Sequence, residues 1–568
     1  MHNYLLFVSN KSIFENKPWL KNYHASIKDN IDIPEEPYTE AIERASKEYP
    51  DNTAIIFLNE KLTYSQLKED FYKFAKALDE NKIKKGDRIA IFLPNCIQFV
   101  VAYLGILKIG AIAVPINPLY TSSEINQIVK DSNSKIIICL DIHYDNVNKA
   151  IKNSEINKVI VTNVADYLPR IKKTIGTIIK KIPSASYPQS SKVTSFKEFM
   201  ETKNKDIPNN KINPKTDLAC LQYTGGTTGI PKGVMLTHKN LVSDRTIAYS
   251  TIEPFLKAGK EIELALLPMF HIYGQVVILG GSLAYGHTLL IFPRLDLNDL
   301  IKKTKEHGVT MFYGVPTLYN ALLNHNKFDK ENVKSVKYFL SGADTLPIEI
   351  SKQWKKSTGK EIIQGYGLTE TSPVVNVSPF NKNKIGSFGV PIPNTLVGLL
   401  DVEKNVMVQD YNTEGELIVN GPQVMKGYWN SIDETKKVLI KFEGKTWFKT
   451  GDLAKMDEEG YFYFIDRIKD MIKYKGYLVS AAEIENVLYK HPAIKETAVI
   501  GVKNKAVGEK IKAYIVLNEK YGNTNEDEII KWCDDKLAPF KIPKLIEFKD
   551  SLPKSTIGKI LKKDLRKN

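Results

Sequence analysis

Short apolar runs alternate with longer helical patterns in the first third of the chain. Two segments of helical length are residues 96–108 and 123–132, and Ser123 is placed to cap the second helix. Strand and helix patterns in alternation are typical of βαβ units, so we predict a parallel sheet covered by helices. The buried strands are predicted at residues 88–93, 111–115, 135–140 and 158–162.

A second region of alternating patterns follows the charged segment "DRIKD", residues 466–470. The apolar run 460–465 before this segment is predicted to be a strand. We therefore predict two domains: a large N-terminal α/β domain, residues 1–466, and a small α+β C-terminal domain, residues 467–568. The polar segment 184–216 is predicted to be a surface loop rather than a boundary. In the C-terminal domain the patterns predict helices at 481–491 and 526–537 and strands at 496–502 and 512–517.

Two apolar segments bear on membrane association. Residues 99–114 carry Lys108 and end before Pro115, which predicts a buried helix and strand rather than a membrane span. Within residues 168–182, one face of a helix about 100° wide gathers Leu168, Ile171, Ile175, Ile178, Ile179 and Ile182. Its flanks and back carry Arg170, Lys172, Lys173, Lys180 and Lys181. Such a helix can lie on an anionic membrane, but a helix packed on the core has the same period, and Gly176 weakens it.

The composition is that of an ordinary globular protein, with 568 residues, 43% hydrophobic and 26% charged. The net charge of +15 favours anionic partners, although a lysine-rich solvated surface explains most of the excess. Nucleic-acid binding would rest on this charge alone, without a recognition motif, and is not predicted. The four cysteines form no CxxC pair, which argues against zinc and disulfides and fits a reducing, cytoplasmic location. The first residues lack the apolar core and basic start of a secretory signal.

A glycine- and threonine-rich loop, "QYTGGTTGIPKGVML" at residues 222–236, follows an apolar run. Backbone N–H groups of such a loop form a cradle for anions, and Lys232 adds positive charge. A Walker A loop requires glycine before the lysine and Ser or Thr after it. Here Pro231 precedes Lys232 and Gly233 follows it, so a P-loop kinase or GTPase is not predicted.

This loop resembles the phosphate loop of the adenylate-forming superfamily, which includes acyl-CoA synthetases, aryl-CoA ligases, firefly luciferase and peptide-synthetase adenylation domains. The resemblance implies a large N-terminal domain of layered α/β subdomains with a small β-barrel, and a small α+β C-terminal lid. It also implies activation of a carboxylic acid with ATP, Mg²⁺ and coenzyme A. The other motifs follow in the family's order: "LPMFHIYG" (267–274), "SGADTLP" (341–347), "QGYGLTETSP" (364–373), "GSFGVP" (386–391), "WFKTGD" (447–452), "DRIKDMIKYKGY" (466–477) and "PKSTIGK" (553–559).

By this resemblance, Tyr366 stacks on adenine, Thr369 contacts the α-phosphate, and Asp452 and Arg467 bind the ribose. Each residue type alone also fits a structural role, such as a packing tyrosine or a turn aspartate. The implied phosphate loop is Thr224, Gly225, Gly226, Thr227, Thr228, Gly229 and Lys232. The implied adenine site also includes Gly342, Ala343, Asp344, Gln364, Gly365 and Gly367, although Asp344 and Thr345 stand where many relatives have small residues. Glu370 and Thr224 are the implied magnesium ligands, and a glutamate there also suits a helix N-terminus.

The implied catalytic residues are Lys559, Glu370, Thr228 and His271. Lys559 would bridge the acyl carboxylate and the α-phosphate, whereas a solvated lysine in a basic tail is its structural alternative. His271 would line the acyl pocket. The family's hinge falls on Lys469, and its second domain orientation would point Lys473 into the site and bring Lys475 and Gly476 to the coenzyme A arm.

The motifs "NPLYTSSEI", "YGVPTLYNALLNH" and "GPQVMKGYWN" look most like the long-chain branch, with Tyr313, Gly314 and Val315 beside the acyl channel. We predict an AMP-forming ligase of fatty acid metabolism that joins a long-chain acid to coenzyme A through an acyl-adenylate, releasing pyrophosphate and AMP. The expected partners are the fatty acid, ATP, coenzyme A, a membrane surface at residues 168–182 and a second copy of the chain. An aryl- or medium-chain acid ligase is the alternative enzyme. The non-enzymatic alternative is a silent fatty-acid or nucleotide-binding protein, against which Thr228, Glu370, Asp452, Arg467 and Lys559 together argue.

Overall fold

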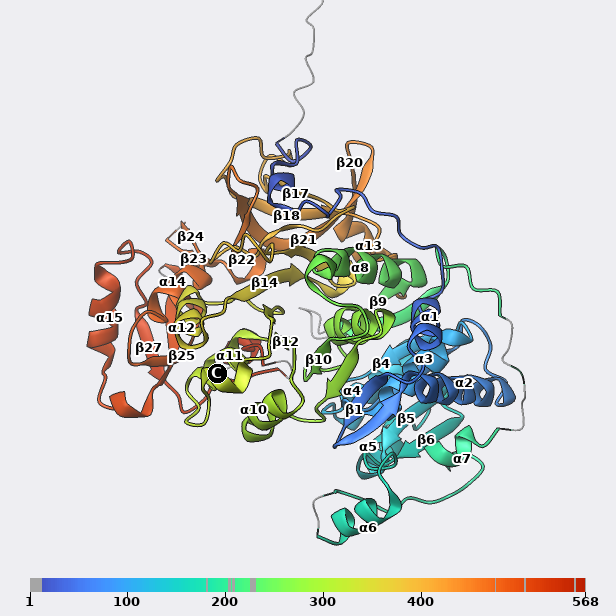
Figure 1. Ribbon diagram of the computed structural model, residues 1–568. Coiled ribbons are helices and arrows are strands. Elements are labelled where there is room, and N and C mark those ends of the chain that lie inside the picture. The colour runs from blue at the N-terminus through green and yellow to red at the C-terminus, as the bar shows by residue number, and fades with distance from the viewer. Residues whose placement is uncertain are drawn as a thin grey trace, which may run out of the picture.

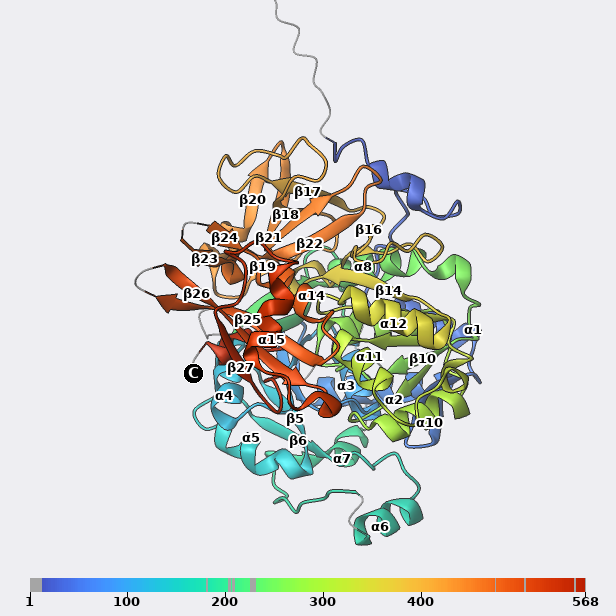
Figure 2. The same cartoon turned by 90° about the vertical axis from the view of Figure 1, so that its left-hand side faces the viewer.

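The computed structural model describes residues 13–179, 182–202, 206, 210–224, 231–475, 477–504, 507–555 and 558–566. Two large mixed sheets and one smaller antiparallel sheet make up most of the chain, and a fourth sheet lies in the C-terminal part (Figure 1). Figure 2 shows the C-terminal strands and α14 to α15 in front of the N-terminal layers. The predicted division into a large α/β part and a small α+β part is confirmed. The exact limit at residues 466 and 467 stays a prediction.

One large sheet has eight strands in the order β19-β9-β8-β4-β3-β5-β6-β7. Its centre, from β8 through β7, is parallel, while β9 and β19 are antiparallel to their neighbours. All four strands predicted between residues 88 and 162 lie in this centre. The strands are β3 (Arg88–Phe92), β4 (Ile112–Pro115), β5 (Ile136–Leu140), β6 (Lys158–Thr162), β7 (Val193–Ser195), β8 (Leu218–Thr224), β9 (Lys232–Thr237) and β19 (Gly427–Tyr428).

The other large sheet has nine strands in the order β16-β15-β14-β13-β12-β10-β11-β1-β2. The run from β14 to β1 is parallel, so the carboxyl ends of β12, β13 and β14 lie at one edge. In open α/β sheets ligands bind at such an edge. The strands are β1 (Thr53–Phe57), β2 (Glu60–Thr63), β10 (Ile262–Ala265), β11 (Thr288–Ile291), β12 (Met311–Gly314), β13 (Tyr338–Ser341), β14 (Ile362–Gly367), β15 (Val374–Val377) and β16 (Val390–Pro391).

The two smaller sheets are mainly antiparallel. One pairs β17 (Leu396–Leu400), β18 (Gly415–Asn420), β20 (Leu439–Phe442), β21 (Lys445–Met456) and β22 (Phe462–Arg467). The small β-barrel stays a prediction. The C-terminal sheet contains β23 (Ile472–Tyr474), β24 (Tyr477–Val479), β25 (Ile494–Asn504), β26 (Gly508–Leu517) and β27 (Leu545–Phe548).

The helix α3 joins the two large sheets into one core. Every residue of α3 from Ile97 to Leu107 is buried, as expected of a helix that is apolar on all sides. Its side chains share one apolar cluster with strands of both sheets, such as β3 and β10. The prediction of a buried helix and strand at residues 99–114 is confirmed. Among the described residues, no helix is long and apolar enough to cross a membrane.

The other helices surround the sheets (Figures 1 and 2). They are α1 (Glu40–Glu48), α2 (Tyr64–Glu80), α4 (Ser122–Asp131), α5 (Tyr144–Ala150), α6 (Arg170–Ile178), α7 (Phe196–Met200), α8 (His238–Ser250), α9 (Ser282–Ala284), α10 (Leu297–Glu306), α11 (Pro316–Leu323), α12 (Ile348–Thr358), α13 (Ile432–Val438), α14 (Ala481–Leu488), α15 (Glu526–Asp534) and α16 (Lys562–Leu565), with α3 at Ile97–Lys108.

Two local predictions need correction. The cap of α4 is Thr121 rather than Ser123, because the Thr121 hydroxyl accepts the Glu124 N–H and the Glu124 carboxylate accepts the Thr121 N–H. The segment 184–216 is not only a loop, since it contains β7 and α7. Phe196 and Phe199 of α7 are buried against Phe74 of α2, and this packing outweighs the polar composition around them.

The amphipathic helix is present as α6 but is shorter than predicted. Ile171 and Ile178 are 75% and 73% exposed, so the apolar face does not pack on the core. Figure 1 shows α6 projecting from the edge of the molecule beyond α5 and α7. Lys180 and Lys181 lie outside the described residues.

Candidate active site

A pocket of about 1770 Å³ lies between the N-terminal sheets and the C-terminal part of the chain. It is lined by the last residues of β8, by residues that follow β13 and β14, and by residues of β21, β22 and the C-terminal segment. The structure thus brings most of the predicted site residues together. Those that line the pocket are Thr224, Lys232, His271, Gly342, Ala343, Asp344, Gln364, Gly365, Tyr366, Gly367, Thr369, Glu370, Asp452, Arg467, Lys469 and Lys559.

Some predicted residues cannot be placed in the pocket. Gly225, Gly226, Thr227, Thr228, Gly229 and Gly476 lie outside the described residues. Lys473 and Lys475 are described, but they do not line the pocket. The Lys473 N–H donates to Glu509 Oε2 at 2.7 Å, and Lys475 has a left-handed φ of 47° at the end of β23. The described domain orientation therefore offers Lys559, rather than these two lysines, to the pocket.

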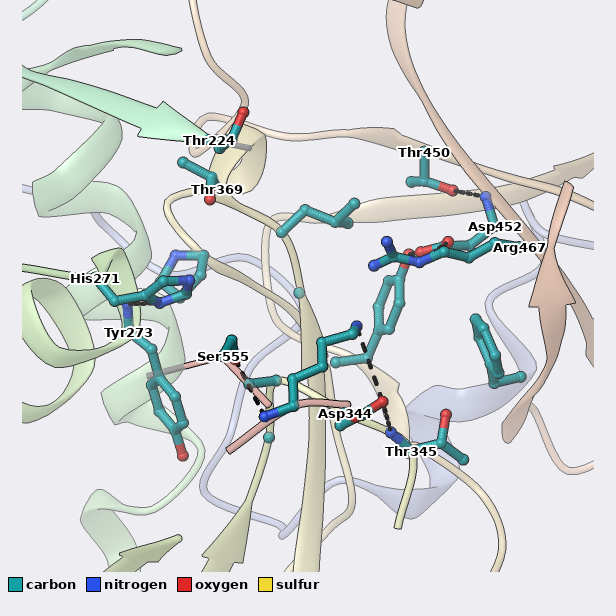
Figure 3. Close-up of a pocket in the computed structure, with 18 of the residues that line it drawn as sticks. Thr224, His271, Tyr273, Asp344, Thr345, Thr369, Thr450, Asp452, Arg467 and Ser555 are labelled. Carbon is teal, nitrogen blue, oxygen red and sulfur yellow. Dashed lines mark hydrogen bonds and ion pairs between the residues drawn. The ribbon is translucent and has the colours of Figure 1, made fainter. Parts of the chain in front are cut away.

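A carboxylate with two partners occupies one wall of the pocket. Asp452 of β21 lies opposite Arg467 of β22 in the strand register. The Tyr366 hydroxyl donates to Asp452 Oδ2 at 2.7 Å. Arg467 Nε lies 3.4 Å from Asp452 Oδ1, and Figure 3 shows these two side chains next to each other. Burial and the neighbouring Asp452 charge raise the pKa of Tyr366 far above its ordinary value. An acceptor-only carboxylate in this position can bind the hydroxyls of a ribose.

Glycine is required beside Tyr366. A Cβ atom at Gly367 would lie 2.0 Å from the Pro373 carbonyl oxygen, so no other residue fits there. Ala343 on the other wall has a left-handed φ of 68°, an uncommon conformation for a residue other than glycine. Both residues border the pocket and have backbone requirements that few other residue types meet.

A second carboxylate lies near the described part of the phosphate loop. The Tyr428 hydroxyl donates to Glu370 Oε1 at 2.8 Å, and removal from water raises the pKa of Glu370. Lys232 Nζ lies 5.2 Å from the centroid of the Tyr428 ring and 2.5 Å from Glu434 Oε2. Hydrogen bonds from Lys232 and Lys437 lower the pKa of Glu434 to about 2.

The donor set around Glu370 suits magnesium. A carboxylate and the Thr224 hydroxyl are hard oxygen ligands, and Mg²⁺ usually takes only one or two protein ligands when phosphates supply the others. Among the described residues no group of three or more His, Cys, Asp or Glu side chains forms a cluster for a metal. The carboxylate of Glu370 and the hydroxyl of Thr224 fit a magnesium ion whose other ligands are phosphate oxygens.

Lys559 enters the pocket from the C-terminal segment. Its N–H donates to the Ser555 hydroxyl at 3.1 Å, and the Ser555 N–H donates to the Lys559 carbonyl at 2.8 Å, which closes a tight turn. Gly558 has a φ of 79°, and a Cβ atom there would lie 2.5 Å from Thr317 Oγ1. Glycine thus allows the turn to approach α11 closely enough for the lysine to reach the pocket.

Burial and neighbouring charges shift the pKa values of Lys559 and His271. Burial lowers the pKa of Lys559, and the Asp344 carboxylate at 3.8 Å opposes that shift. Burial and the Lys559 charge lower the pKa of His271 to about 4. His271 is therefore neutral near pH 7, and Figure 3 shows it with Tyr273 on the pocket side opposite Asp452. A neutral imidazole there suits a wall of the pocket.

Several residues that support the site were not predicted from the sequence. Tyr428 and Glu434 hold Glu370 and Lys232, Ser555 holds the Lys559 turn, and Thr317 lies close to Gly558 in that turn. Tyr428 stood in the quoted motif "GPQVMKGYWN", but the motif does not reveal that β19 pairs with β9 behind Lys232. No sequence signal marks Glu434.

The chain matches two family models in sequence. One, described as "AMP-binding enzyme", matches residues 42–429, and the other, described as "AMP-binding enzyme C-terminal domain", matches residues 483–559. The chain is 38% identical over 554 residues to a long-chain-fatty-acid–CoA ligase of Bacillus subtilis (strain 168), covering 97% of each chain. It is 31% identical over 556 residues to a probable 4-coumarate–CoA ligase 1 of Dictyostelium discoideum, covering 96% of this chain and 98% of that protein. The structure of ATP-bound MatB from Rhodopseudomonas palustris has a TM-score of 0.80 and 26% identity, over 93% of this chain and 98% of that one.

Proposed function

Because the chain belongs to the AMP-binding enzyme family, we propose that it uses ATP to join a long-chain fatty acid to coenzyme A. The acid first becomes an acyl-adenylate with release of pyrophosphate, and the thiol of coenzyme A then displaces AMP. The observation that carries this proposal is that Lys559 enters the same pocket as Asp452 and Glu370. A cation, a ribose-binding carboxylate and a magnesium-binding carboxylate are what an attack of a carboxylate on a nucleotide phosphate requires.

In the first step a carboxylate oxygen attacks the α-phosphorus and the bond to pyrophosphate breaks. Both reactants are anionic, so the ammonium group of Lys559 stabilises the charge that develops between them. Thr369 and Lys232 both line the pocket. Thr369 would donate a hydrogen bond to the α-phosphate, and Lys232 would bind the other phosphates together with the phosphate loop. Magnesium would bind at Glu370 and Thr224 and neutralise the phosphate charge.

The nucleoside is held on the opposite side of the pocket. Asp452 would accept hydrogen bonds from the ribose hydroxyls, and Arg467 would keep that carboxylate oriented. Tyr366 and the backbone of residues 342–344 would enclose adenine. The remaining residues of the proposed nucleotide site are Gln364, Gly365 and Gly367.

The second step requires the C-terminal part to present other residues to the pocket. We propose that the chain turns at Lys469, within the short helical turn Ile468–Asp470, so that Lys473 replaces Lys559 and Lys475 meets coenzyme A. The described position of Lys475, outside the pocket, agrees with an orientation that serves the first step. His271 and Tyr313 would line the acyl part of the pocket in both orientations.

An isotope experiment tests this reaction. Palmitate labelled with ¹⁸O in its carboxylate is incubated with the protein, ATP, magnesium and coenzyme A. An acyl-adenylate intermediate transfers one labelled oxygen to AMP, because the acyl–oxygen bond breaks in the second step. Label in inorganic phosphate with ADP, or no product, would contradict the proposal.

An aryl acid is the alternative substrate, since a relative with a 4-coumarate–CoA ligase name is 31% identical. The long-chain proposal is supported by 38% identity to a long-chain-fatty-acid–CoA ligase over nearly the full chain. Cinnamate in the same isotope experiment separates the two. Transfer of label from cinnamate and not from palmitate would favour the aryl reaction.

We also propose that α6 contacts a membrane surface from the cytoplasmic side. Its isoleucines are exposed, whereas Lys172 and Lys173 are paired with Glu60 and Asp166, so apolar insertion rather than charge would supply most of the affinity. The four cysteines are all buried free thiols, which fits a reducing compartment.

Vesicle sedimentation tests this contact. A variant with Ile171, Ile175 and Ile178 changed to serine is expected to lose binding, whereas Ile142→Ser, at an exposed isoleucine outside α6, is expected to keep it. Equal binding by the two variants would contradict the membrane proposal. Sizing chromatography of the same proteins checks the predicted homodimer.

A further inference from the structure

A buried carboxylate lies beneath the pocket and takes no part in the proposed reaction. Glu263 of β10 is 0% exposed, and three side chains bond to it. The Tyr249 hydroxyl donates to Oε1 at 2.8 Å and the Tyr313 hydroxyl donates to Oε2 at 2.8 Å. His287 Nδ1 lies 2.7 Å from Oε1 and donates when it carries the proton. A buried carboxylate with three donors is a satisfied polar group, in contrast to the apolar side chains around it.

The sheet topology explains how residues so far apart in sequence meet. Glu263 lies opposite Met311 in the parallel register of β10 and β12, so Tyr313 is diagonal to it on the same face of the sheet. His287 precedes β11, the neighbour of β10 on the other side. Tyr249 reaches the group from α8, which covers this face.

Two of the three donors also line the pocket. Tyr249 and Tyr313 both border it, although each is almost fully buried, whereas Glu263 and His287 do not border it. Their hydroxyls are bonded to Glu263, so the two tyrosines link the lining of the pocket to the buried carboxylate. Glu263 thus binds the hydroxyl groups of two residues that border the pocket.

The rings of Tyr249 and Tyr313 each pack against a further aromatic side chain. The Tyr249 ring is stacked on Tyr285 with centroids 3.9 Å apart. The Tyr313 ring lies edge-to-face with Tyr273, with centroids 6.2 Å apart. Tyr273 follows His271 by two residues, and Figure 3 shows both at the pocket edge beside the Lys559 turn. Tyr273 and Tyr313 thus connect the side of the pocket near Lys559 to the buried Glu263.

We propose that Glu263 is a positioning residue that sets the acyl chain length of the enzyme through the rings of Tyr249 and Tyr313. This inference rests on the proposed fatty-acid ligase function. The Tyr249 hydroxyl also lies 2.6 Å from His287 Nδ1, whereas Glu263 is the acceptor for the Tyr313 hydroxyl. If Glu263 cannot accept from Tyr313, that buried hydroxyl loses its acceptor, and the ring turns to find another. The wall then moves, and the pocket admits acids of other lengths.

The experiment compares kcat/KM for a series of saturated acids from octanoate to arachidate in full-length variants, with the Tm of each. Tyr313→Ala removes a ring from the wall. Glu263→Gln keeps the size of the side chain but replaces one acceptor oxygen with a donor. Tyr64→Phe is the matched control, because the Tyr64 hydroxyl donates to the His287 carbonyl at 2.7 Å but does not border the pocket.

For each protein, kcat/KM with a longer acid is divided by kcat/KM with the acid that the wild type prefers. Tyr313→Ala is expected to raise this ratio about tenfold, the effect of burying two further methylene groups. Glu263→Gln is expected to reduce the ratio of kcat/KM for the best acid to kcat/KM for the next longer even-chain acid. The expected reduction is about fourfold, the effect of about one methylene group. Tyr64→Phe is expected to lower the Tm without changing these ratios.

A Glu263→Gln protein with a lower Tm and the wild-type chain-length ratios would overturn the inference, because the cluster would then serve stability alone. The same conclusion would follow if Tyr313→Ala left the ratios unchanged. A wild-type protein that activates aryl acids and no fatty acid would overturn the proposed function, and this inference with it.

Discussion

The Nζ atom of Lys559 lies 3.8 Å from Oδ1 of Asp344, which joins the C-terminal segment to the loop that follows β13. Both side chains are about one-third exposed, so the pair is partly screened by water. Burial lowers the pKa of Lys559, while the Asp344 carboxylate favours the charged ammonium. Asp344 therefore helps to keep the proposed catalytic lysine protonated.

Asp344→Asn is expected to lower the pKa of Lys559 further. Because the reaction uses the charged lysine, the loss of adenylation at high pH should begin at a lower pH than in the wild type. ATP–pyrophosphate exchange measured from neutral to alkaline pH checks this. Asp344→Glu, which keeps the charge, is the control, and an unchanged alkaline limb in Asp344→Asn would show that the pair does not affect Lys559.

Lys559→Ala is expected to slow adenylation by about 10² to 10³-fold, the usual effect of removing a group that stabilises transition-state charge. Conversion of a supplied acyl-adenylate to acyl-CoA should be nearly unchanged, because Lys559 serves only the first step. Lys554→Ala is the control, since Lys554 lies in the same segment but pairs with Glu496 at 2.5 Å. Equal loss of both steps in Lys559→Ala would contradict the proposed role.

Tyr428→Phe removes the hydrogen bond to Glu370 while keeping the ring beside Lys232. A hydrogen bond to a charged group contributes about 1.5 to 3 kcal/mol, so the apparent affinity for magnesium–ATP should fall about tenfold or more. Titration of the exchange rate with magnesium–ATP measures this. Tyr461→Phe is the control, because the Tyr461 hydroxyl donates to the Lys382 carbonyl away from the pocket.

The buried His238 is expected to make the free energy of unfolding depend on pH. It is 0% exposed, its Nδ1 accepts the Tyr38 N–H at 3.2 Å, and burial lowers its pKa to about 4. The unfolded chain binds a proton at this histidine below about pH 6.5, but the folded chain does so only below about pH 4. The free energy of unfolding should thus fall as the pH falls between these values, by about 3 kcal/mol from this residue.

Urea unfolding at several pH values measures this dependence. His238→Asn should be less stable than the wild type near pH 7 but should lose less stability on acidification. His24→Asn is the control at a surface histidine that bonds to Ser26. An identical pH slope in the wild type and His238→Asn would contradict the assignment.

Local patterns predicted the central elements of the fold. The strands β3 to β6 and the helix α3 are formed by runs that are apolar on both faces, and such runs have few other ways to bury their side chains. The cap of α4 was placed two residues late, because Thr121 and Ser123 are both cap formers and only the reciprocal bond to Glu124 distinguishes them.

Long-range relationships were not predictable from these patterns. Tyr249, Glu263, His287 and Tyr313 meet only because β10 lies between β11 and β12, and of the four only Tyr313 belongs to a quoted motif. The exposure of α6 was also undecided, since a membrane-facing helix and a core-packed helix share the same period.

Most of the candidate site was predictable from the resemblance of ordered motifs, which carry the residues around Tyr366, Asp452 and Lys559. The supporting residues Ser555, Thr317 and Tyr428 were not predictable. Their roles depend on contacts in the folded chain, which the motifs do not reveal. The contribution of residues 225–229 lies outside the described residues and stays a prediction.

The most direct test of the central claim is pyrophosphate release from magnesium–ATP with a panel of acids, with and without coenzyme A. The panel runs from acetate to stearate and includes benzoate and cinnamate. The account predicts release that is greatest with long-chain acids and that turns over repeatedly only when coenzyme A is present. No release with any acid, from protein that still binds ATP, would contradict it.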